Sequence, residues 1–370
     1  MNESVLIGTR KGVFRLNPDE RIRPFGFVGV PVTSVLRDPR DGAIYVGLDH
    51  GHFGVKLHRS DDDGETWAEL SAPAYPDKGD VVDINPMSQK PLEWTTQLLW
   101  SLEAGHADDP DELWCGTIPG GLFRSPDRGE TWSLVRSLWD RPERREAFGG
   151  GYDDPGLHSI SVDPRGGGRM VVGISCGGAW CTDDGGDSWA IANGMIATFV
   201  PPELGANPAI QDPHRVVRCA SAPDVLWTQH HCGIFRSTDG GRTWSDAGAA
   251  ATPSAFGFAV AAHPQDPETA WFVPAESDEV RVPIGGRLTV SRTRDGGRTF
   301  EELDRGLPQE SAYHLVYRHC LDVSDDGDRL VFGSTTGSLW SGRGCSGPAS
   351  EASFRLLTAD LPPILSLRFG

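Results

Sequence analysis

An eight-residue motif recurs five times in this 370-residue sequence and constrains the fold more than any other feature. It reads Ser/Thr-x-Asp-x-Gly-x-Thr/Ser-Trp/Phe. The closing aromatic residues, which follow one another at intervals of 65, 57, 55 and 56 residues, are Trp67, Trp132, Trp189, Trp244 and Phe300. Self-similarity at such a period is typical of proteins built from repeated structural units. The sequence therefore predicts an array of similar units.

Each unit contains enough apolar runs for four short strands. Two runs separated by a glycine-containing turn, such as 113–116 and 122–125, precede each motif and predict a hairpin. The same hairpin, without a complete motif, occurs at 5–16 and 330–341, so the chain has seven units. A further apolar run precedes the hairpins, at 32–36, 158–162, 215–219, 256–261 and 313–318. Four-stranded units repeated in this way predict a β-propeller.

The two ends of the sequence complement each other. The last apolar run, 364–369, has no hairpin after it, and the first unit has no run before its hairpin. Pairing these two segments would cover a strand edge that otherwise stays exposed. We therefore expect an all-β, single seven-bladed β-propeller over 1–370. Its blade 1 combines 1–30 with 362–370, so the C-terminal strand joins the N-terminal blade.

The amino-acid composition limits which kinds of binding partner and which cellular compartment we expect. The 46 Gly and 28 Pro argue against long helices. An excess of 52 acidic over 34 basic residues gives a net charge of −18, which argues against nucleic acid and membrane surfaces as partners. The N-terminal residues do not resemble an export signal, and the seven irregularly spaced cysteines do not form a disulfide framework. We expect a cytoplasmic protein.

The repeated motif resembles the Asp-box, or BNR repeat, of sialidases, sortilin-type receptors, xyloglucanase-type glycoside hydrolases and photosystem assembly factors. The chain as a whole resembles bacterial exo-sialidase-like and glycosyl-hydrolase-like proteins. In such families the Asp-box lies on the face opposite the active site. Its hydroxyl and carboxylate groups can bond the amides of a tight turn between the third and fourth strands. We therefore assign a structural role to the motif aspartates Asp62, Asp127, Asp184, Asp239 and Asp295.

The ligand site is expected on the other face, in the upper central funnel. Four long connections, 71–96, 135–157, 193–214 and 274–287, lead there, and long loops in compact domains are usually functional. Imidazole and indole groups on this face suit a small polar or carbohydrate-like ligand. The predicted ligand-binding residues are His50, His52, His158, His214, His231 and Trp94.

An alternative is a metal-dependent enzyme. Inner strands of a propeller converge, so histidines at their starts could bind a divalent or transition metal such as zinc, copper or iron. The predicted ligands are His158, His214, His231 and His319. No short motif with the spacing of a helical zinc site accompanies them, so the sequence leaves the cofactor unspecified.

The resemblance to sialidases implies a third set of residues. Tyr313 stands where those enzymes keep a tyrosine nucleophile, and Arg215 and Arg318 could bind a carboxylate. Two departures argue against classical sialidase activity: the Phe/Tyr-Arg-Ile-Pro motif is absent, and sialidase propellers have six blades. Another hydrolase activity stays open, and so does a non-catalytic role as an interaction or assembly scaffold.

Overall fold

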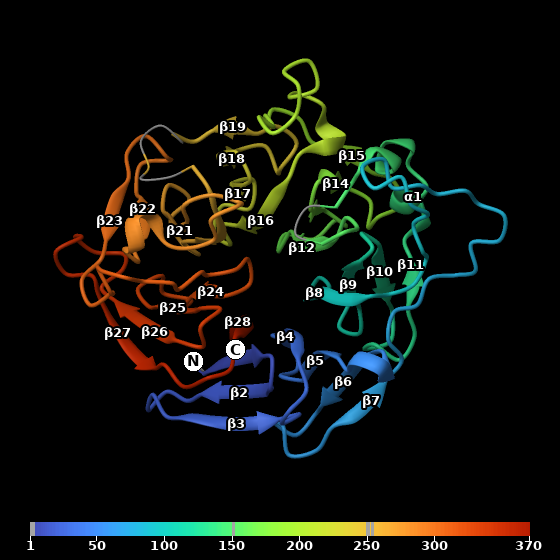
Figure 1. Cartoon of the computed structure of the whole chain (residues 1–370). Coiled ribbons are helices and arrows are strands. Elements are labelled where there is room, and N and C mark those ends of the chain that lie inside the picture. Colours follow the sequence, from blue (N-terminus) through green and yellow to red (C-terminus); the bar gives the residue numbers. More distant parts are fainter. Residues whose placement is uncertain (1–3, 150–151, 249–251, 253–254) are drawn as a thin grey trace. The chain divides into compact units, whose positions relative to one another are not determined.

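The computed structural model describes residues 4–149, 152–248, 252 and 255–370. Its strands form seven four-stranded antiparallel sheets (Figure 1), which confirms the predicted seven-bladed β-propeller. The helices described are single short turns: α1 (Arg136–Trp139), η1 (Gly51–Phe53), η2 (Pro142–Glu146), η3 (Pro208–Ile210) and η5 (Ile284–Gly286). Over the described ranges, none has the length and apolar character needed to span a membrane.

The chain divides into two compact units. The four-blade unit comprises Met1–Val32, His214–Asp239 and Ser245–Gly370. The three-blade unit comprises Thr33–Pro213 and Gly240–Trp244.

Blades 1, 5, 6 and 7 belong to the four-blade unit. Blade 1 contains β28 (Ile364–Phe369), β1 (Val5–Thr9), β2 (Gly12–Leu16) and β3 (Ile22–Gly26). Blade 5 contains β16 (Pro213–Arg218), β17 (Leu226–His230), β18 (Gly233–Ser237) and β19 (Ser245–Asp246). Blade 6 contains β20 (Gly257–Ala262), β21 (Ala270–Pro274), β22 (Val290–Thr293) and β23 (Glu301–Leu303). Blade 7 contains β24 (Leu321–Val323), β25 (Leu330–Gly333), β26 (Leu339–Arg343) and β27 (Ser353–Thr358).

Blades 2, 3 and 4 belong to the three-blade unit. Blade 2 contains β4 (Val32–Arg37), β5 (Ile44–Asp49), β6 (Val55–Ser60) and β7 (Ala68–Leu70). Blade 3 contains β8 (Leu98–Ala104), β9 (Leu113–Ile118), β10 (Leu122–Ser125) and β11 (Ser133–Leu134). Blade 4 contains β12 (Leu157–Val162), β13 (Met170–Ile174), β14 (Gly178–Thr182) and β15 (Ala190–Ile191).

The second strand of each blade is buried on both faces, which explains why apolar residues dominate most of these strands. Strands β9, β13 and β17 are buried at every position. Within each unit, successive blades pack against each other; β5 contacts β8, for example, and β20 contacts β24. Sheets covered on both faces lose the alternation of apolar and polar residues seen in half-exposed sheets.

The C-terminal strand completes blade 1 as the sequence predicts. Strand β28 pairs antiparallel with β1, with Val5 opposite Phe369 and Ile7 opposite Leu367. Ile364 is fully buried and Leu367 is 5% exposed. The described part of the predicted 1–30 segment begins at Ser4, since residues 1–3 lie outside the described residues.

One predicted strand is wrong. The apolar run 313–318 does not form the inner strand of blade 7; that strand is β24, which begins at Leu321. Leu315 and Val316 are nevertheless buried, Leu315 among aromatic side chains that include Phe256 and Phe258. The apolar run 313–318 therefore belongs to a buried loop. Apolar residues occur at buried positions whether or not their backbone forms hydrogen bonds with a neighbouring strand.

The Asp-box caps the turn between the third and fourth strands. In blade 3, the Ser125 hydroxyl donates to Oδ1 of Asp127 (2.8 Å) and accepts from the Gly129 amide (2.8 Å). The amide and hydroxyl of Thr131 donate to the two oxygens of the same carboxylate, at 2.8 and 2.6 Å. The bond from the first residue of the motif to the carboxylate measures 2.7–3.1 Å at Asp62, Asp127, Asp184, Asp239 and Asp295.

These bonds account for the acidity of the motif carboxyl groups. Hydrogen bonds from Thr66, chiefly its hydroxyl, lower the pKa of Asp62 to about 2, and those from Ser188 do the same for Asp184. The pKa of Asp127 and that of Asp295 are also lowered. Donors that point at a carboxylate favour its charged form, so the motif requires an ionised aspartate.

Removing residues 364–370 is expected to destabilise the protein by at least about 3 kcal/mol, because it exposes the edge of β1 and empties the sites of Ile364 and Leu367. Urea unfolding of the full chain and the truncated chain measures the difference. A synthetic peptide of residues 361–370 should restore part of the loss. Equal unfolding midpoints for the two chains would show that β28 contributes nothing.

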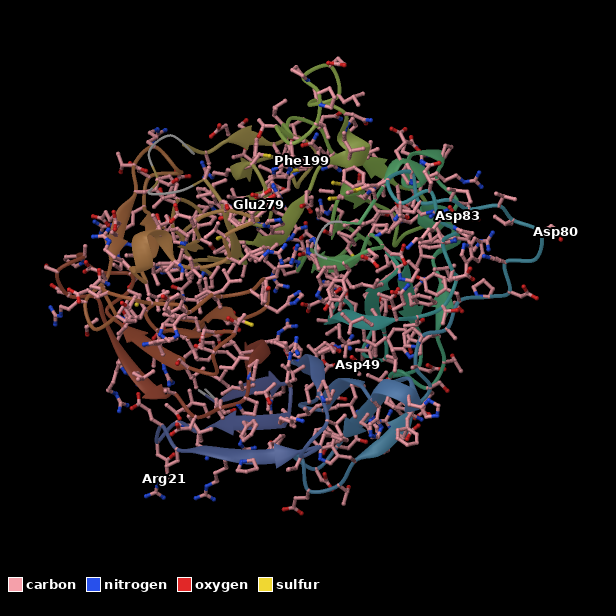
Figure 2. All side chains as sticks on the ribbon, viewed as in Figure 1. Arg21, Asp49, Asp80, Asp83, Phe199 and Glu279 are labelled. Carbon is pink, nitrogen blue, oxygen red and sulfur yellow. The ribbon has the colours of Figure 1, made fainter. Side chains whose placement is uncertain are left out.

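Asp127→Ala is expected to lower the free energy of unfolding by about 1 kcal/mol, because three turn donors lose their acceptor at a solvent-exposed site. Asp80→Ala is the matched control: Asp80 lies on an exposed loop (Figure 2), and its replacement should have no effect. Equal destabilisation by both substitutions would contradict the capping role.

The contribution of Asp184 to the stability of the folded protein should disappear in acid. Its folded pKa of about 2 lies below the unfolded value of about 3.9, so the unfolded chain binds more protons between them. The stabilisation is complete above pH ~5 and is lost as the pH falls toward ~2. The difference in Tm between the wild type and Asp184→Asn should shrink over that range. A difference that does not change with pH would exclude this linkage.

Candidate functional site

A cluster of imidazole and phenyl rings lies at the start of β16 and β20 in the four-blade unit. The ring of His214, the second residue of β16, stacks on Phe258, with centroids 4.6 Å apart and an angle of 18° between the planes. The edges of His231 and Phe256 meet the same imidazole at 5.4 and 5.6 Å. His231 comes from the hairpin turn between β17 and β18, so two blades contribute to this ring cluster.

A hydrogen bond fixes which of the two ring nitrogens of His214 carries a proton. Nδ1 of His214 lies 2.6 Å from the carbonyl oxygen of Gly257. A carbonyl oxygen only accepts, so Nδ1 carries the proton and, in the neutral imidazole, Nε2 carries the lone pair. His214 is 2% exposed, whereas the side chain of His231 keeps 21% of its surface exposed.

Charged groups surround the ring cluster, and two of them come from the long connection 274–287. Asp278 places a carboxylate oxygen 3.5 Å from Nε2 of His231. The guanidinium groups of Arg281 and Arg318 lie 5.6 and 5.1 Å from the centre of the Phe258 ring. Glu279, in the same connection, is labelled in Figure 2. A partly buried imidazole, an exposed carboxylate and an exposed guanidinium beside phenyl rings can recognise hydroxyl groups together with an apolar face.

Asp212 lies two residues before His214. Its Oδ1 accepts hydrogen bonds from the Ser175 hydroxyl and the Cys176 amide, each at 3.0 Å.

The structure brings together two of the four predicted metal ligands, His214 and His231. His158 is fully buried, and its two nitrogens lie 2.8 Å from the Ser159 hydroxyl and 2.7 Å from the Pro213 carbonyl. His319 lies two residues before β24. Asp212, Asp278 and Phe258 were not predicted from the sequence. The Asp-Pro-His run at 212–214 was the available signal for the first.

The other predicted ligand-binding residues lie in the three-blade unit. His50 precedes the exposed turn η1 and His52 lies within it, and both rings contact Phe53. The indole N–H of Trp94 donates to Asp83 (3.2 Å; Asp83 is labelled in Figure 2), and Asp83 forms a buried ion pair with Arg144 (2.7 Å). Trp94 therefore helps to anchor the connection 71–96.

The residues implied by the resemblance to sialidases occupy different environments. Tyr313 is 67% exposed on a loop, and Arg318 is buried against Phe258. Arg215 lies on β16, where its charge acts on Asp322 of β24. Desolvation raises the pKa of Asp322, although the Phe369 amide and the charges of Arg368 and Arg215 oppose the change. This carboxyl group was not predicted from the sequence.

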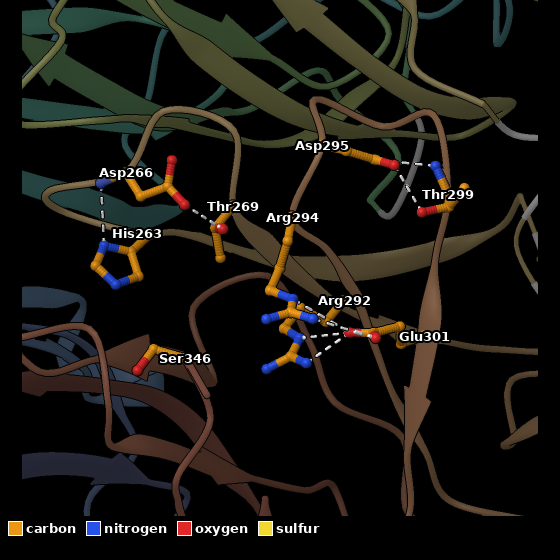
Figure 3. A pocket seen from close by; sticks show the side chains of 9 residues that line it. All are labelled: His263, Asp266, Thr269, Arg292, Arg294, Asp295, Thr299, Glu301 and Ser346. Atoms are coloured by element: carbon orange, nitrogen blue, oxygen red, sulfur yellow. Dashed lines mark hydrogen bonds and ion pairs between the residues drawn. The ribbon is translucent and has the colours of Figure 1, made fainter. Parts of the chain in front are cut away.

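A separate open pocket of about 460 Å³ lies on the Asp-box side of blade 6 (Figure 3). Its deepest cation, the fully buried Arg292, bonds Glu301 and the carbonyl oxygens of Cys345 and Gly347. The pocket is lined by His263, Asp266, Thr269, Arg292, Arg294, Asp295, Thr299, Glu301 and Ser346. Since Glu301 already neutralises Arg292 and Asp295 caps its turn, these groups hold blade 6 together.

Comparison with known proteins agrees with this architecture. The BNR/Asp-box repeat family matches residues 235–246. An oligoxyloglucan-reducing end-specific xyloglucanase of Emericella nidulans is 35% identical over 278 residues, which cover 70% of this chain and 30% of that enzyme. The chain spans less than a third of the length of the two curated relatives it matches.

Two solved structures have a similar fold. A GH74 enzyme of Niastella koreensis aligns with a TM-score of 0.63 at 16% identity, covering 97% of this chain and 52% of that one. YCF48 from Cyanidioschyzon merolae aligns with a TM-score of 0.54 at 15% identity, covering 90% of this chain and 92% of that one. With five Asp-box turns on seven four-stranded blades, the chain is a β-propeller of the Asp-box (BNR-repeat) family.

Proposed function

We propose that the protein is a glycoside-hydrolase-like propeller that binds a carbohydrate at the ring cluster of His214, His231, Phe256 and Phe258. The observation that carries the proposal is the position of the exposed Asp278 and Arg281 beside these rings. The sequence similarity to a xyloglucanase supports the same class of ligand.

The chemistry of a sugar matches these groups. A pyranose presents C–H groups on its ring faces and hydroxyl groups around its edge, so it is recognised by apolar rings combined with polar side chains. The Asp278 carboxylate can accept hydrogen bonds from sugar hydroxyl groups, His231 can donate or accept them, and Arg281 adds donors. Asp278 is also a carboxylate of the type that glycoside hydrolases use as acid, base or nucleophile.

Arg281→Ala is expected to weaken the binding of a xyloglucan oligosaccharide about 10-fold, because the ligand loses one charge-assisted contact. Isothermal titration calorimetry measures the affinity, and release of reducing ends from the same oligosaccharide measures hydrolysis. Asp278→Asn should reduce hydrolysis more than binding. Arg287→Ala, an exposed arginine at the end of the same connection, is the control and should bind like the wild type.

Failure of the wild type to bind the oligosaccharide, or equal affinities for Arg281→Ala and Arg287→Ala, would exclude this proposal.

Protein binding is the second candidate function. Four exposed apolar residues of the connection 71–96 favour it, namely Val81, Val82, Ile84 and Met87. Exposed apolar side chains gathered on one loop are typical of surfaces that contact another protein.

A further inference from the structure

We infer that Thr336 and His314 form a hydroxyl–imidazole pair that hydrolyses small acyl esters. Oγ1 of Thr336 lies 2.6 Å from Nδ1 of His314. Both residues belong to the four-blade unit, and neither is part of the ring cluster. Ester hydrolysis is a different reaction from sugar recognition, so this inference goes beyond the proposed function and does not rest on it.

A backbone hydrogen bond brings the two side chains together. Thr336 lies in the turn between β25 and β26, and His314 lies in the loop that precedes β24. The Thr335 amide donates to the carbonyl oxygen of Leu315 (2.9 Å), so the turn and the loop are joined one residue away from each member of the pair. Leu315 is 5% exposed, and its burial anchors the loop.

Aromatic packing supports the imidazole ring. The centroid of His314 lies 4.8 Å from that of Trp340, with an angle of 75° between the planes. Trp340 is 2% exposed and stacks on the fully buried Phe332. A ring held against buried side chains keeps its nitrogen directed at its partner, which a base that activates a hydroxyl group requires.

The hydrogen bonds around Thr336 determine which ring nitrogen of His314 carries the proton. The Ser334 hydroxyl lies 2.8 Å from Oγ1 of Thr336 and 3.4 Å from the carbonyl oxygen of Ser338. A hydroxyl group has one proton and the shorter contact is the better hydrogen bond, so Ser334 donates to Thr336. Thr336 then donates its own proton to Nδ1 of His314, and Nε2 carries the ring proton. Ser334 is therefore a positioning residue.

His314 can act as a base toward Thr336. Burial lowers the pKa of His314, so the imidazole is neutral at pH 7. A neutral imidazole that accepts a hydrogen bond from a hydroxyl group is the arrangement that activates serine and threonine as nucleophiles. The side chain of Thr336 is exposed, so an ester in solution can reach its oxygen.

The reaction has two steps. Oγ1 of Thr336 attacks the carbonyl carbon of the ester while Nδ1 of His314 takes the hydroxyl proton. The Thr336 amide, which has no hydrogen-bond partner in the described ranges of the chain, donates to the oxyanion that forms. His314 gives the proton to the departing alcohol as the ester bond breaks. Water, deprotonated by His314, then hydrolyses the acyl-threonine, which releases the acid and restores the hydroxyl group.

The test uses the full-length protein and two probes. Turnover is measured with p-nitrophenyl acetate, and a fluorophosphonate forms a stable adduct with an activated hydroxyl group. Peptide mass spectrometry should locate this adduct on Thr336. Thr336→Val should abolish it, and His314→Gln should slow both reactions about 100-fold, because the base is lost. Thr336→Ser keeps a hydroxyl group and should retain both reactions.

Ser311→Ala is the matched control, because it removes an exposed hydroxyl group from the same loop as His314 and should react like the wild type. Circular dichroism and Tm establish that each variant is folded. Absence of the adduct from Thr336 in the wild type, or equal turnover by Thr336→Val and Ser311→Ala, would overturn the inference. Thr336→Val should bind the oligosaccharide like the wild type, so failure of the ester reaction and failure of sugar binding are distinguished.

Ser334→Ala tests the positioning role. Nitrogen NMR of the histidine side chains should show Nδ1 of His314 unprotonated in the wild type. In Ser334→Ala a larger fraction of the rings should carry the proton on Nδ1, because the Thr336 oxygen then accepts a hydrogen bond from the ring. Reaction with the fluorophosphonate should slow about 10-fold. A wild-type ring protonated at Nδ1 would also overturn the inference.

Discussion

The hydrogen bonding of the Asp-box carboxylate is the interaction on which five of the seven blades depend. In blade 3 a single side chain, Asp127, accepts hydrogen bonds from the hydroxyl of Ser125 and from both donors of Thr131, so one carboxylate fixes the turn into the fourth strand. The aromatic residue that closes the motif then packs into the core: Trp189 is 6% exposed and lies beside Trp114 and Trp180. The eight residues of the motif thereby supply both the hydrogen bonds that cap the turn and an aromatic side chain that packs into the core.

Because the motif occupies one end of the strands, the other end is left for binding. In blade 5 the β17–β18 turn carries His231, and the first strand of the sheet begins beside His214. Antiparallel strands place alternate turns at opposite ends, so the Asp-box and the β17–β18 turn must lie apart. The same topology puts the insertion after β21, with Asp278 and Arg281, at the end of blade 6 that faces the ring cluster.

Long connections in this protein have two different roles. The connection 71–96 is held by the buried pair of Asp83 and Arg144, and Arg144 also stacks on Trp139, 4.1 Å from the ring centre. These polar and aromatic residues therefore stabilise the loop itself. The connection 274–287 instead presents exposed charges to an aromatic surface. Length alone does not separate these roles, since both loops are long and both contain charged residues.

The sequence by itself determined the seven blades, the five capped turns and the pairing of β28 with β1, because these follow from short-range motifs and from strand edges that must be paired. Only the tertiary structure decided which histidines meet. His158 and His214 look alike in sequence, at the starts of two inner strands, yet both nitrogens of His158 have hydrogen-bonding neighbours in the protein, whereas His214 lies against His231. The position of a side chain relative to one far along the chain depends on packing, which periodicity does not encode.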